Sequence, residues 1–286
     1  MMNTLNGRNQ WNNFTQSFQQ VDIMRSDIQS MNFNIRMCCA YENPNILKLS
    51  QKQHLLLNGV YFRSFKYFEN VKTELRELLK PDLSSYSRAE SFIPSENRDS
   101  FKICVHVKSP SKSVSTPSDP YLTRLSTDFL VETYKKLFNY IVVIVFGNDP
   151  IFAHSLFHDK TGKTKVPNYA KPTFELPADS PDYNVILTPS LHPEDDISLS
   201  NYYCDVVFLS SPTSAFGWWL GYMAKDGSTV YYRDIHDIHD SIVNEMISSD
   251  YYPSDWMKLR RKKNGGMKIM GKVEKVVNFE EELLTD

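Results

Sequence analysis

The sequence lacks a long apolar run, since no stretch approaches the roughly 18 uninterrupted apolar residues of a membrane-spanning helix. Its first residues, MMNTLNGRNQWNNFTQ, also lack the basic and apolar segments of a signal peptide. We therefore expect a soluble chain as written, which associates with a membrane only if an anchor stands upstream of residue 1.

An excess of one charge is missing as well. The chain carries 32 Lys and Arg against 34 Asp and Glu, for a formal net charge of −2. Because no basic field covers the protein, we do not expect nucleic acid as a partner, and any site for an anion has to be local.

Cysteine is scarce, and its spacing is not that of a metal site. The cysteines are Cys38, Cys39, Cys104 and Cys204, with no CxxC pair. Because Cys104 and Cys204 lie in or beside apolar strands, we expect buried thiols rather than a disulfide framework. The compartment stays open on this evidence, and no bound metal is expected.

Several site motifs are absent. There is no GxGxxG after a strand, no GxxxxGK[ST] and no GxSxG, which disfavours a classical dinucleotide fold, a P-loop nucleotidase and a serine hydrolase. The segment HDIHD could place His236, His239 and Asp240 on one helix face, but a solvated helix start is the favoured interpretation. The basic run 260–263 is interpreted as part of a solvated tail.

What is present is an alternation of strands and helices. Strands are predicted at 101–107, 141–146, 184–189, 205–210 and 228–232; helices are predicted at 69–79, 123–140, from 149 onward, 194–204, 214–225 and 236–249. Residues 83–100 are interpreted as a polar loop or linker. This order indicates an α/β fold with a mostly parallel sheet covered on both faces, as in a Rossmann-like half.

In such a sheet, ligands bind at the carboxyl ends of the strands. The loops at these ends are polar: they contain 106–109, 147–149, 188–190 and 210–214. A single polar loop is explained by the cap that every helix needs. Several polar loops at one edge of the sheet suit a phosphate or diphosphate, because they bring together a basic residue and the start of a helix that has Thr213 or Ser214 as its N-cap. The neighbouring Trp218 and Trp219 are interpreted as core.

The segment TSAFGWWLGYMA resembles the S[ST]FxWWxAxL signature of the α-1,2-fucosyltransferases of glycosyltransferase family eleven, especially their divergent nematode branch. Other segments fit in the same order. CVHVK resembles the HxRRxD strand end, VIVFGNDPIF the FSDD segment, PEDDISLSNYYCDVVFLSS the DxxLSxCD segment, LLNGVYFRSFKYF the GYFQSYKYF stretch and YYPSDWMKL the closing YxPxxW. The resemblance covers about residues 35 to 260.

The resemblance implies a GT-B-like architecture and transfer of fucose from GDP-fucose to a galactose-terminated glycan, with inversion and without a metal. It implies the Golgi lumen or membrane as the location. The chain is divided accordingly into a poorly ordered segment 1–35, a truncated acceptor-side region 36–99, a Rossmann-like donor-binding domain 100–260 and a C-terminal tail 261–286.

The resemblance also implies a donor-binding site. Its predicted residues are His106, Lys108, Asn148, Asp149, Asp196, Thr213, Ser214 and Phe216. No residue is identified as the catalytic base.

The chain departs from the family pattern where the phosphates should bind. Lys108 and Ser109 stand where the family has two arginines, and Ser111 stands where it has an aspartate. A lysine supplies only a point charge where a guanidinium grips two oxygens. Two functions therefore remain open: a working fucosyltransferase, or a catalytically impaired relative that binds a nucleotide sugar or a glycan.

Overall fold

The computed structural model describes residues 24–33, 38–59, 62–110, 116–160, 180–189, 192–237, 241–244 and 246–270. The chain forms two compact units, one of Met1–Lys80 with Asp240–Ser254 and the other of Pro81–His239 with Asp255–Asp286. The predicted segment 1–35 falls largely outside the described residues. The second unit contains the strands and helices in which the predicted site lies.

The described part of the second unit is built on a seven-stranded sheet in the order β5-β4-β3-β6-β7-β8-β9. The strands are β3 (Phe101–Val107), β4 (Ile141–Gly147), β5 (Asn184–Leu187), β6 (Val206–Leu209), β7 (Thr229–Arg233), β8 (Met257–Arg261) and β9 (Met267–Met270). All neighbouring strands are parallel except β8 and β9. The predicted α/β fold with a mostly parallel sheet is confirmed.

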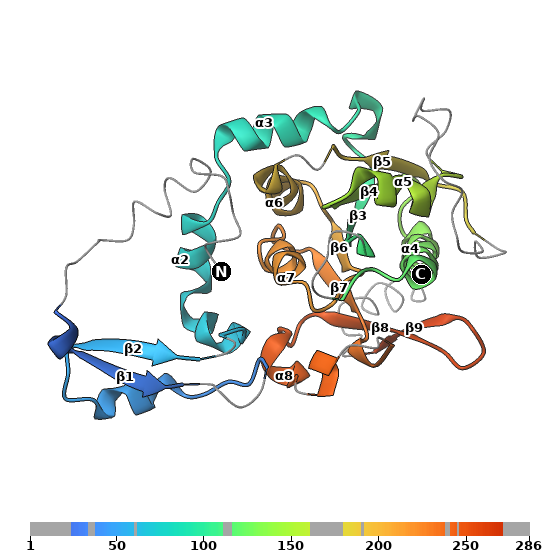
Figure 1. Ribbon diagram of the computed structural model, residues 1–286. Coiled ribbons are helices and arrows are strands. Elements are labelled where there is room, and N and C mark those ends of the chain that lie inside the picture. Colours follow the sequence, from blue (N-terminus) through green and yellow to red (C-terminus); the bar gives the residue numbers. More distant parts are fainter. Residues whose placement is uncertain are drawn as a thin grey trace, which may run out of the picture. The chain divides into compact units, whose positions relative to one another are not determined.

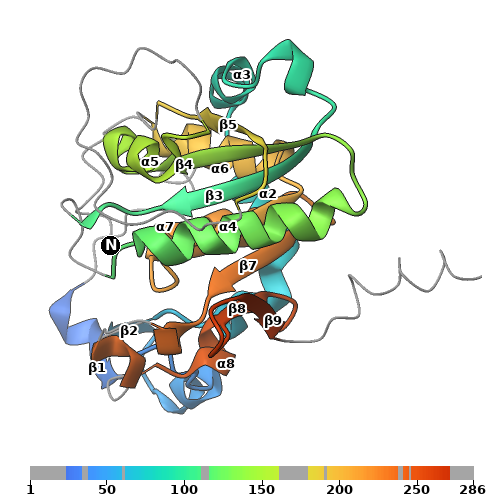
Figure 2. The ribbon, with the colours of Figure 1, turned by 90° about the vertical axis from the view of Figure 1, so that its right-hand side faces the viewer.

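Helices cover both faces of this sheet. They are α3 (Leu83–Ser91), α4 (Pro120–Lys135), α5 (Pro150–Phe157), α6 (Pro193–Tyr202) and α7 (Ala215–Tyr222). Helices α4 and α5 lie on one face and α6 and α7 on the other (Figure 1). Figure 2 looks onto the face that α4 covers. Along β3, Ile103, Val105 and Val107 pack in the core with α4 and α5, so Cys104 and His106 face the side of α6 and α7.

The strand order creates a switch point between β3 and β6. From β3 the chain steps outward through β4 to β5, then returns to place β6 on the other side of β3. At such a point, the loops after the two central strands diverge to opposite faces, and ligands of α/β sheets bind in the space between them. The loops after β3 and β6 are the ones that carry most of the predicted site.

Two helices of the second unit are set by their caps. Asp119 accepts a hydrogen bond from Leu122 N, and Pro120 stands at the first position of α4, so this helix begins three residues before the predicted start at 123. The loop or linker predicted at 83–100 is wrong for residues 83–91, which form α3; residues 92–100 contain only the 3-10 turn Ser95–Asn97. Asp82 caps α3 by accepting from Ser85 N, and Arg88 of α3 pairs with Asp195 of α6.

The predicted closing helix 236–249 is also wrong in the described residues. They form two short 3-10 helices, at Ile235–Asp237 and Ser241–Asn244, and the short helix α8 (Ser248–Tyr251). The buried carboxylate of Asp234 accepts from His236 N and from Arg260 Nε, which fixes the turn after β7. Arg260 thus belongs to β8 of the sheet, and the basic run lies in the β8–β9 hairpin rather than in a solvated tail. His239 and Asp240 lie outside the described residues.

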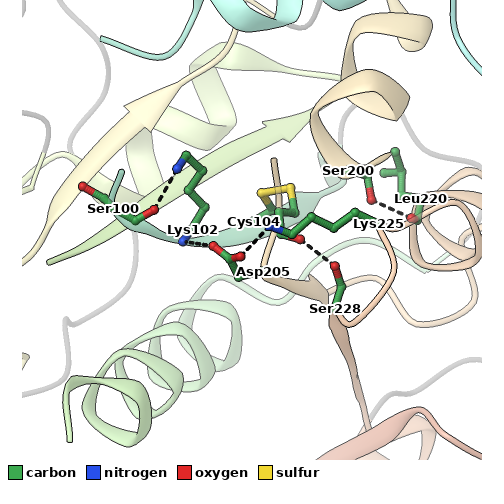
Figure 3. Close-up of a disulfide and its surroundings, with 9 residues drawn as sticks. Ser100, Lys102, Cys104, Ser200, Asp205, Leu220, Lys225 and Ser228 are labelled. Atoms are coloured by element: carbon green, nitrogen blue, oxygen red, sulfur yellow. Dashed lines mark hydrogen bonds and ion pairs between the residues drawn. A yellow bond between two sulfur atoms is a disulfide. The ribbon is translucent and has the colours of Figure 1, made fainter. Parts of the chain in front are cut away.

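The expectation of buried thiols is corrected by two disulfides. Cys104 in the middle of β3 is bonded to Cys204, which lies two residues before β6, with the two Cα atoms 5.6 Å apart. Figure 3 shows this bond beside the carboxylate of Asp205, which accepts from Lys102 N and pairs with Lys225. Cys38 and Cys39 are bonded to each other. The sequence pattern missed the first pair because only the strand order brings β3 beside β6.

The first unit contains a parallel pair of strands, β1 (Ile28–Asn32) and β2 (His54–Asn58). It also contains α2 (Lys72–Leu78), which follows a 3-10 turn at Glu69–Val71 and confirms the helix predicted at 69–79. The carboxylate of Asp250 holds distant parts of this unit together. It pairs with Lys66 at 2.5 Å and accepts from Tyr41 N at 2.7 Å.

No helix in the described part of the chain has the length and apolar character required to cross a lipid bilayer.

We predict that Cys204→Ser lowers the free energy of unfolding of the second unit by about 2–4 kcal/mol, because the bond closes a loop between residues 100 positions apart. Urea denaturation of the oxidised protein measures this loss. The double variant Cys104→Ser/Cys204→Ser serves as the control and should be no less stable than the single variant. An unchanged urea midpoint in Cys204→Ser would show that this bond does not stabilise the unit.

Candidate functional site

Hydroxyl groups join the loop after β3 to the loop after β6. Lys108 N donates to Ser118 Oγ at 2.9 Å, and Ser118 N donates to Lys108 O at 2.9 Å. The Ser118 and Ser210 hydroxyls are 2.5 Å apart, and Ser210 Oγ donates to His106 O at 2.7 Å. A continuous set of hydrogen bonds therefore runs from the carboxyl end of β3 to the carboxyl end of β6.

Two further hydrogen bonds shape the same edge. Ser211 Oγ donates to Thr116 O at 2.6 Å, so the segment before α4 is held to the loop after β6. Ser109 N donates to Asn148 Oδ1 at 2.9 Å, which links the loop after β3 to the loop after β4. Three loops that are far apart in the sequence are thus brought together, as predicted from their positions.

The start of α7 is a capped helix N-terminus at this edge. Ser214 is the N-cap, and its hydroxyl accepts from Gly217 N at 3.1 Å. The other N–H groups of the first turn have no carbonyl partner within the helix, and they lie at the positive end of its dipole. Thr213 directly precedes the cap. Its side chain is buried, and its hydroxyl has no hydrogen-bond partner in the structure.

His106 lies against this helix start. Its ring meets Phe216 edge-on with a centroid distance of 6.0 Å, and its Nδ1 is buried without a hydrogen-bond partner. Burial, with the nearby positive charge of Lys108, lowers the pKa of His106 to about 3. The imidazole is therefore neutral at physiological pH, and it cannot supply a positive charge to an anion.

Lys108 is one cation at this edge, next to the end of β3. It is half-buried directly after β3, and its charge acts on His106. Ser109, at the place of the second family arginine, has a buried side chain. Ser111, at the place of the family aspartate, lies outside the described residues. The arrangement can attract a phosphate group by one lysine and by helix N–H groups.

The two predicted acids have different surroundings. Asp149 is the N-cap of α5, and its carboxylate accepts from Ile151 N and Phe152 N. Asp196 lies in the first turn of α6, a helix that packs against α7. It is 3% exposed, and Oδ1 has no hydrogen-bond partner. Burial, with the nearby charges of Asp195 and Glu194, raises the pKa of Asp196 well above its ordinary value.

The expectation that both tryptophans belong to the core is confirmed for Trp218, whereas Trp219 is only half-buried. Trp218 is buried and stacks on Tyr222 with a centroid distance of 4.8 Å. It also lies against Trp256, at 5.8 Å. Trp219 meets Trp218 edge-on at 5.1 Å. These contacts fix α7 on the sheet and leave its first turn at the carboxyl edge.

Two residues of this edge, Ser118 and Gly217, were not predicted from the sequence. Ser118 gives no signal because it precedes a helix start that we placed too late. Gly217 stands inside the tryptophan signature. Because glycine is a weak helix former, its presence in a helix could have indicated that another residue packs closely against the helix there. Among the described residues, no three His, Cys, Asp and Glu side chains gather as a metal site would require.

Comparison with known proteins gives relatives from Caenorhabditis elegans. One named galactoside 2-alpha-L-fucosyltransferase is 41% identical over 234 residues, which are 80% of this chain and 58% of the relative. Another of the same name is 29% identical over 80% of this chain and 60% of its own length. A putative galactoside 2-alpha-L-fucosyltransferase, svh-11, is 32% identical over 79% of this chain and 58% of its own length.

The chain thus spans about three fifths of the length of these relatives. No family model matches the sequence, and no solved structure matches it either.

We predict that Asp196→Asn stabilises the protein at pH 7. The pKa of Asp196 is raised in the folded state, so the folded protein holds this proton more tightly than the unfolded chain does. The carboxyl therefore costs no stability at pH values below 3.8, and its cost grows as the pH rises towards the raised pKa. The variant should therefore gain about 1 kcal/mol or more at neutral pH, and this gain should vanish towards pH 4. Urea denaturation at several pH values measures the difference.

The neighbouring variant Asp195→Asn is the matched control. Asp195 pairs with Arg88 at 2.8 Å, so its neutralisation should lower stability at pH 7, by at most about 1 kcal/mol because Arg88 is 40% exposed. Equal losses in both variants would contradict the assignment of Asp196 as an unpaired buried acid.

Proposed function

Because the chain belongs to the α-1,2-fucosyltransferase-like family, we propose that it transfers fucose from GDP-fucose to a galactose hydroxyl of a glycan, with inversion and without a metal. The second unit then is the donor-binding half of a GT-B-like enzyme, and the first unit belongs to the acceptor side. The donor and the acceptor are those implied by the family resemblance.

One observation carries this proposal. The segments that resemble the family motifs meet at the carboxyl ends of β3 and β6, where hydroxyl groups link Lys108 through Ser118 to Ser210. The capped start of α7 follows four residues later. A diphosphate suits such an edge because the lysine charge, the helix N–H groups and the dipole all favour negative charge.

The predicted residues take different parts in this site. Lys108, Thr213 and the first turn of α7 contact the diphosphate, while Ser214 caps that turn. Asp196 offers a buried acceptor oxygen that N–H groups of the nucleotide can satisfy. His106 and Phe216 pack beneath the helix start.

Asn148 and Asp149 support the loops of the site, since their side chains accept hydrogen bonds from backbone N–H groups.

The reaction requires stabilisation of a leaving group. The acceptor oxygen bonds to C1 of fucose as the bond from C1 to the phosphate oxygen breaks, and the electron pair leaves with GDP. The acceptor proton passes to a base that we do not identify. Negative charge grows on the diphosphate during this step, so Lys108 and the α7 amides supply electrostatic stabilisation where it is needed.

We propose the Golgi lumen as the location, in keeping with the family resemblance. The Cys104–Cys204 disulfide supports an oxidising compartment, because such bonds are rare where glutathione keeps thiols reduced.

The second candidate function is a non-catalytic protein that binds a nucleotide sugar or a glycan. It is favoured by Ser109, which stands where the family has its second arginine. Ser109 has no guanidinium to offer a diphosphate, and its side chain is buried while its backbone N–H donates to Asn148. Calorimetric titration with GDP and GDP-fucose, followed by an assay of transfer to a β-galactoside, separates the two functions. Binding with turnover supports the enzyme, and binding without turnover supports the binding protein. The absence of both contradicts the enzyme and a protein that binds a nucleotide sugar.

We predict that Lys108→Ala weakens GDP binding by about tenfold or more, since it removes a charge-assisted contact to phosphate. Lys108→Arg should bind GDP at least as tightly as the wild type, because a guanidinium can grip two oxygens. Isothermal titration calorimetry measures both affinities.

Lys135→Ala is the matched control for charge. Lys135 is exposed at the far end of α4, away from the carboxyl edge of the sheet, and should not affect GDP affinity. If Lys108→Ala binds GDP as tightly as Lys135→Ala does, the diphosphate has been placed wrongly.

A further inference from the structure

The His106 imidazole and Gly217 are in unusually close contact. A Cβ atom added at Gly217 would lie 2.8 Å from His106 Nδ1 and 3.0 Å from Cε1. Real Cβ atoms essentially never come as close as 2.8 Å to another heavy atom, so a side chain at position 217 requires the imidazole or the helix to shift. The first turn of α7 therefore rests directly on the ring of a β3 residue.

The surroundings of His106 suit a spacer better than an acid, a base or an ion-pair partner. The residue is 3% exposed and neutral at physiological pH, and its Nδ1 has no hydrogen-bond partner. Phe216 covers the ring from the same helix turn. The backbone of His106 is fixed independently, because its carbonyl accepts from Ser210 Oγ.

The same contact controls the cap of α7. Ser214 Oγ accepts from Gly217 N at 3.1 Å, and the Ser214 Cβ would lie 3.3 Å from a Cβ at position 217. A shift of position 217 away from His106 would therefore disturb both the N-cap bond and the direction of the first N–H groups. A displacement of a few tenths of an ångström matters because hydrogen bonds to an anion are directional.

We propose that His106 is a positioning residue, whose ring sets the first turn of α7 at the distance from β3 that the nucleotide diphosphate requires, with Gly217 as its obligatory partner. The inference rests on the proposed function for its ligand. It assigns His106 an action through the helix and no contact with the diphosphate.

The helix contains its own control. Gly221 lies one turn after Gly217, and a Cβ there would lie 2.7 Å and 2.8 Å from ring atoms of Trp256 and 3.0 Å from Val230. Gly217→Ala and Gly221→Ala thus introduce the same methyl group with similar crowding. The first methyl group meets His106 at the carboxyl edge, and the second meets the core.

The experiment measures GDP affinity by calorimetry and melting temperature by circular dichroism for both glycine variants, for His106→Ala and for His106→Ala/Gly217→Ala. Both glycine variants should lower the melting temperature, but only Gly217→Ala should also weaken GDP binding, by about tenfold. In the double variant the smaller side chain at 106 makes room for the new methyl group. GDP affinity should then recover at least in part relative to Gly217→Ala.

The possible results separate this inference from the proposed function. A double variant that binds GDP no better than Gly217→Ala overturns the spacer role, because His106 then contributes a contact of its own. Equal GDP affinities in Gly217→Ala and Gly221→Ala also overturn it. If the wild type does not bind GDP, the proposed function fails, and the melting temperatures then test the contact between His106 and Gly217. Additive changes in melting temperature in His106→Ala and Gly217→Ala overturn this contact, and non-additive changes support it.

Discussion

The hydrogen bond from the Ser210 hydroxyl to the carbonyl of His106 is the constraint on which the candidate site depends. It joins the carboxyl ends of β3 and β6, the two strands between which the chain reverses its direction across the sheet. Because Ser118 also contacts Ser210, the segment before α4 is fixed at the same place. Lys108 and the start of α7 lie on separate loops, and these bonds add to the β3–β6 ladder in holding the two loops together. One lysine and one helix start can then act on the same anion.

The sequence predicted the strands of the second unit well for a physical reason. Parallel strands that are buried on both faces are continuous apolar runs, and IVVIVF at 141–146 needs no periodicity to be recognised. Features that depend on pairing between distant strands were not predictable in the same way. The Cys104–Cys204 bond follows from β3 lying beside β6, and the strand order is invisible in a linear pattern. Helix α3 was missed because its sequence, LSSYSRAES, is mostly polar. Its cap at Asp82 and its packing of Tyr86 against Tyr202 of α6 are visible only in the structure.

The sequence predicted which loops meet at the candidate site, but it did not predict what each side chain in those loops does. Asp149 and Asp196 were both predicted as donor-binding acids from the same resemblance. In the structure Asp149 accepts two backbone N–H groups and caps α5, whereas Asp196 keeps an oxygen without a partner. A side chain whose hydrogen bonds are satisfied within the protein has little left to offer a ligand, whereas an unsatisfied buried acceptor costs stability that only a ligand or a proton can recover. Burial and partners, rather than residue type, therefore distinguish a support from a binding group.

The same reasoning applies to the positive charge of the site. His106 is held neutral by burial, and Ser109 is buried with its backbone bonded to Asn148, so neither adds charge to Lys108. A single lysine binds phosphate less specifically than a pair of arginines, because it has no planar fork to match two oxygens. In the proposed donor site, the orientation of the diphosphate would come from the α7 amides, whose directions are fixed by backbone geometry. This makes the placement of α7 more important here than in a site with two guanidinium groups, and it explains why a glycine packed on an imidazole can matter as much as a charge.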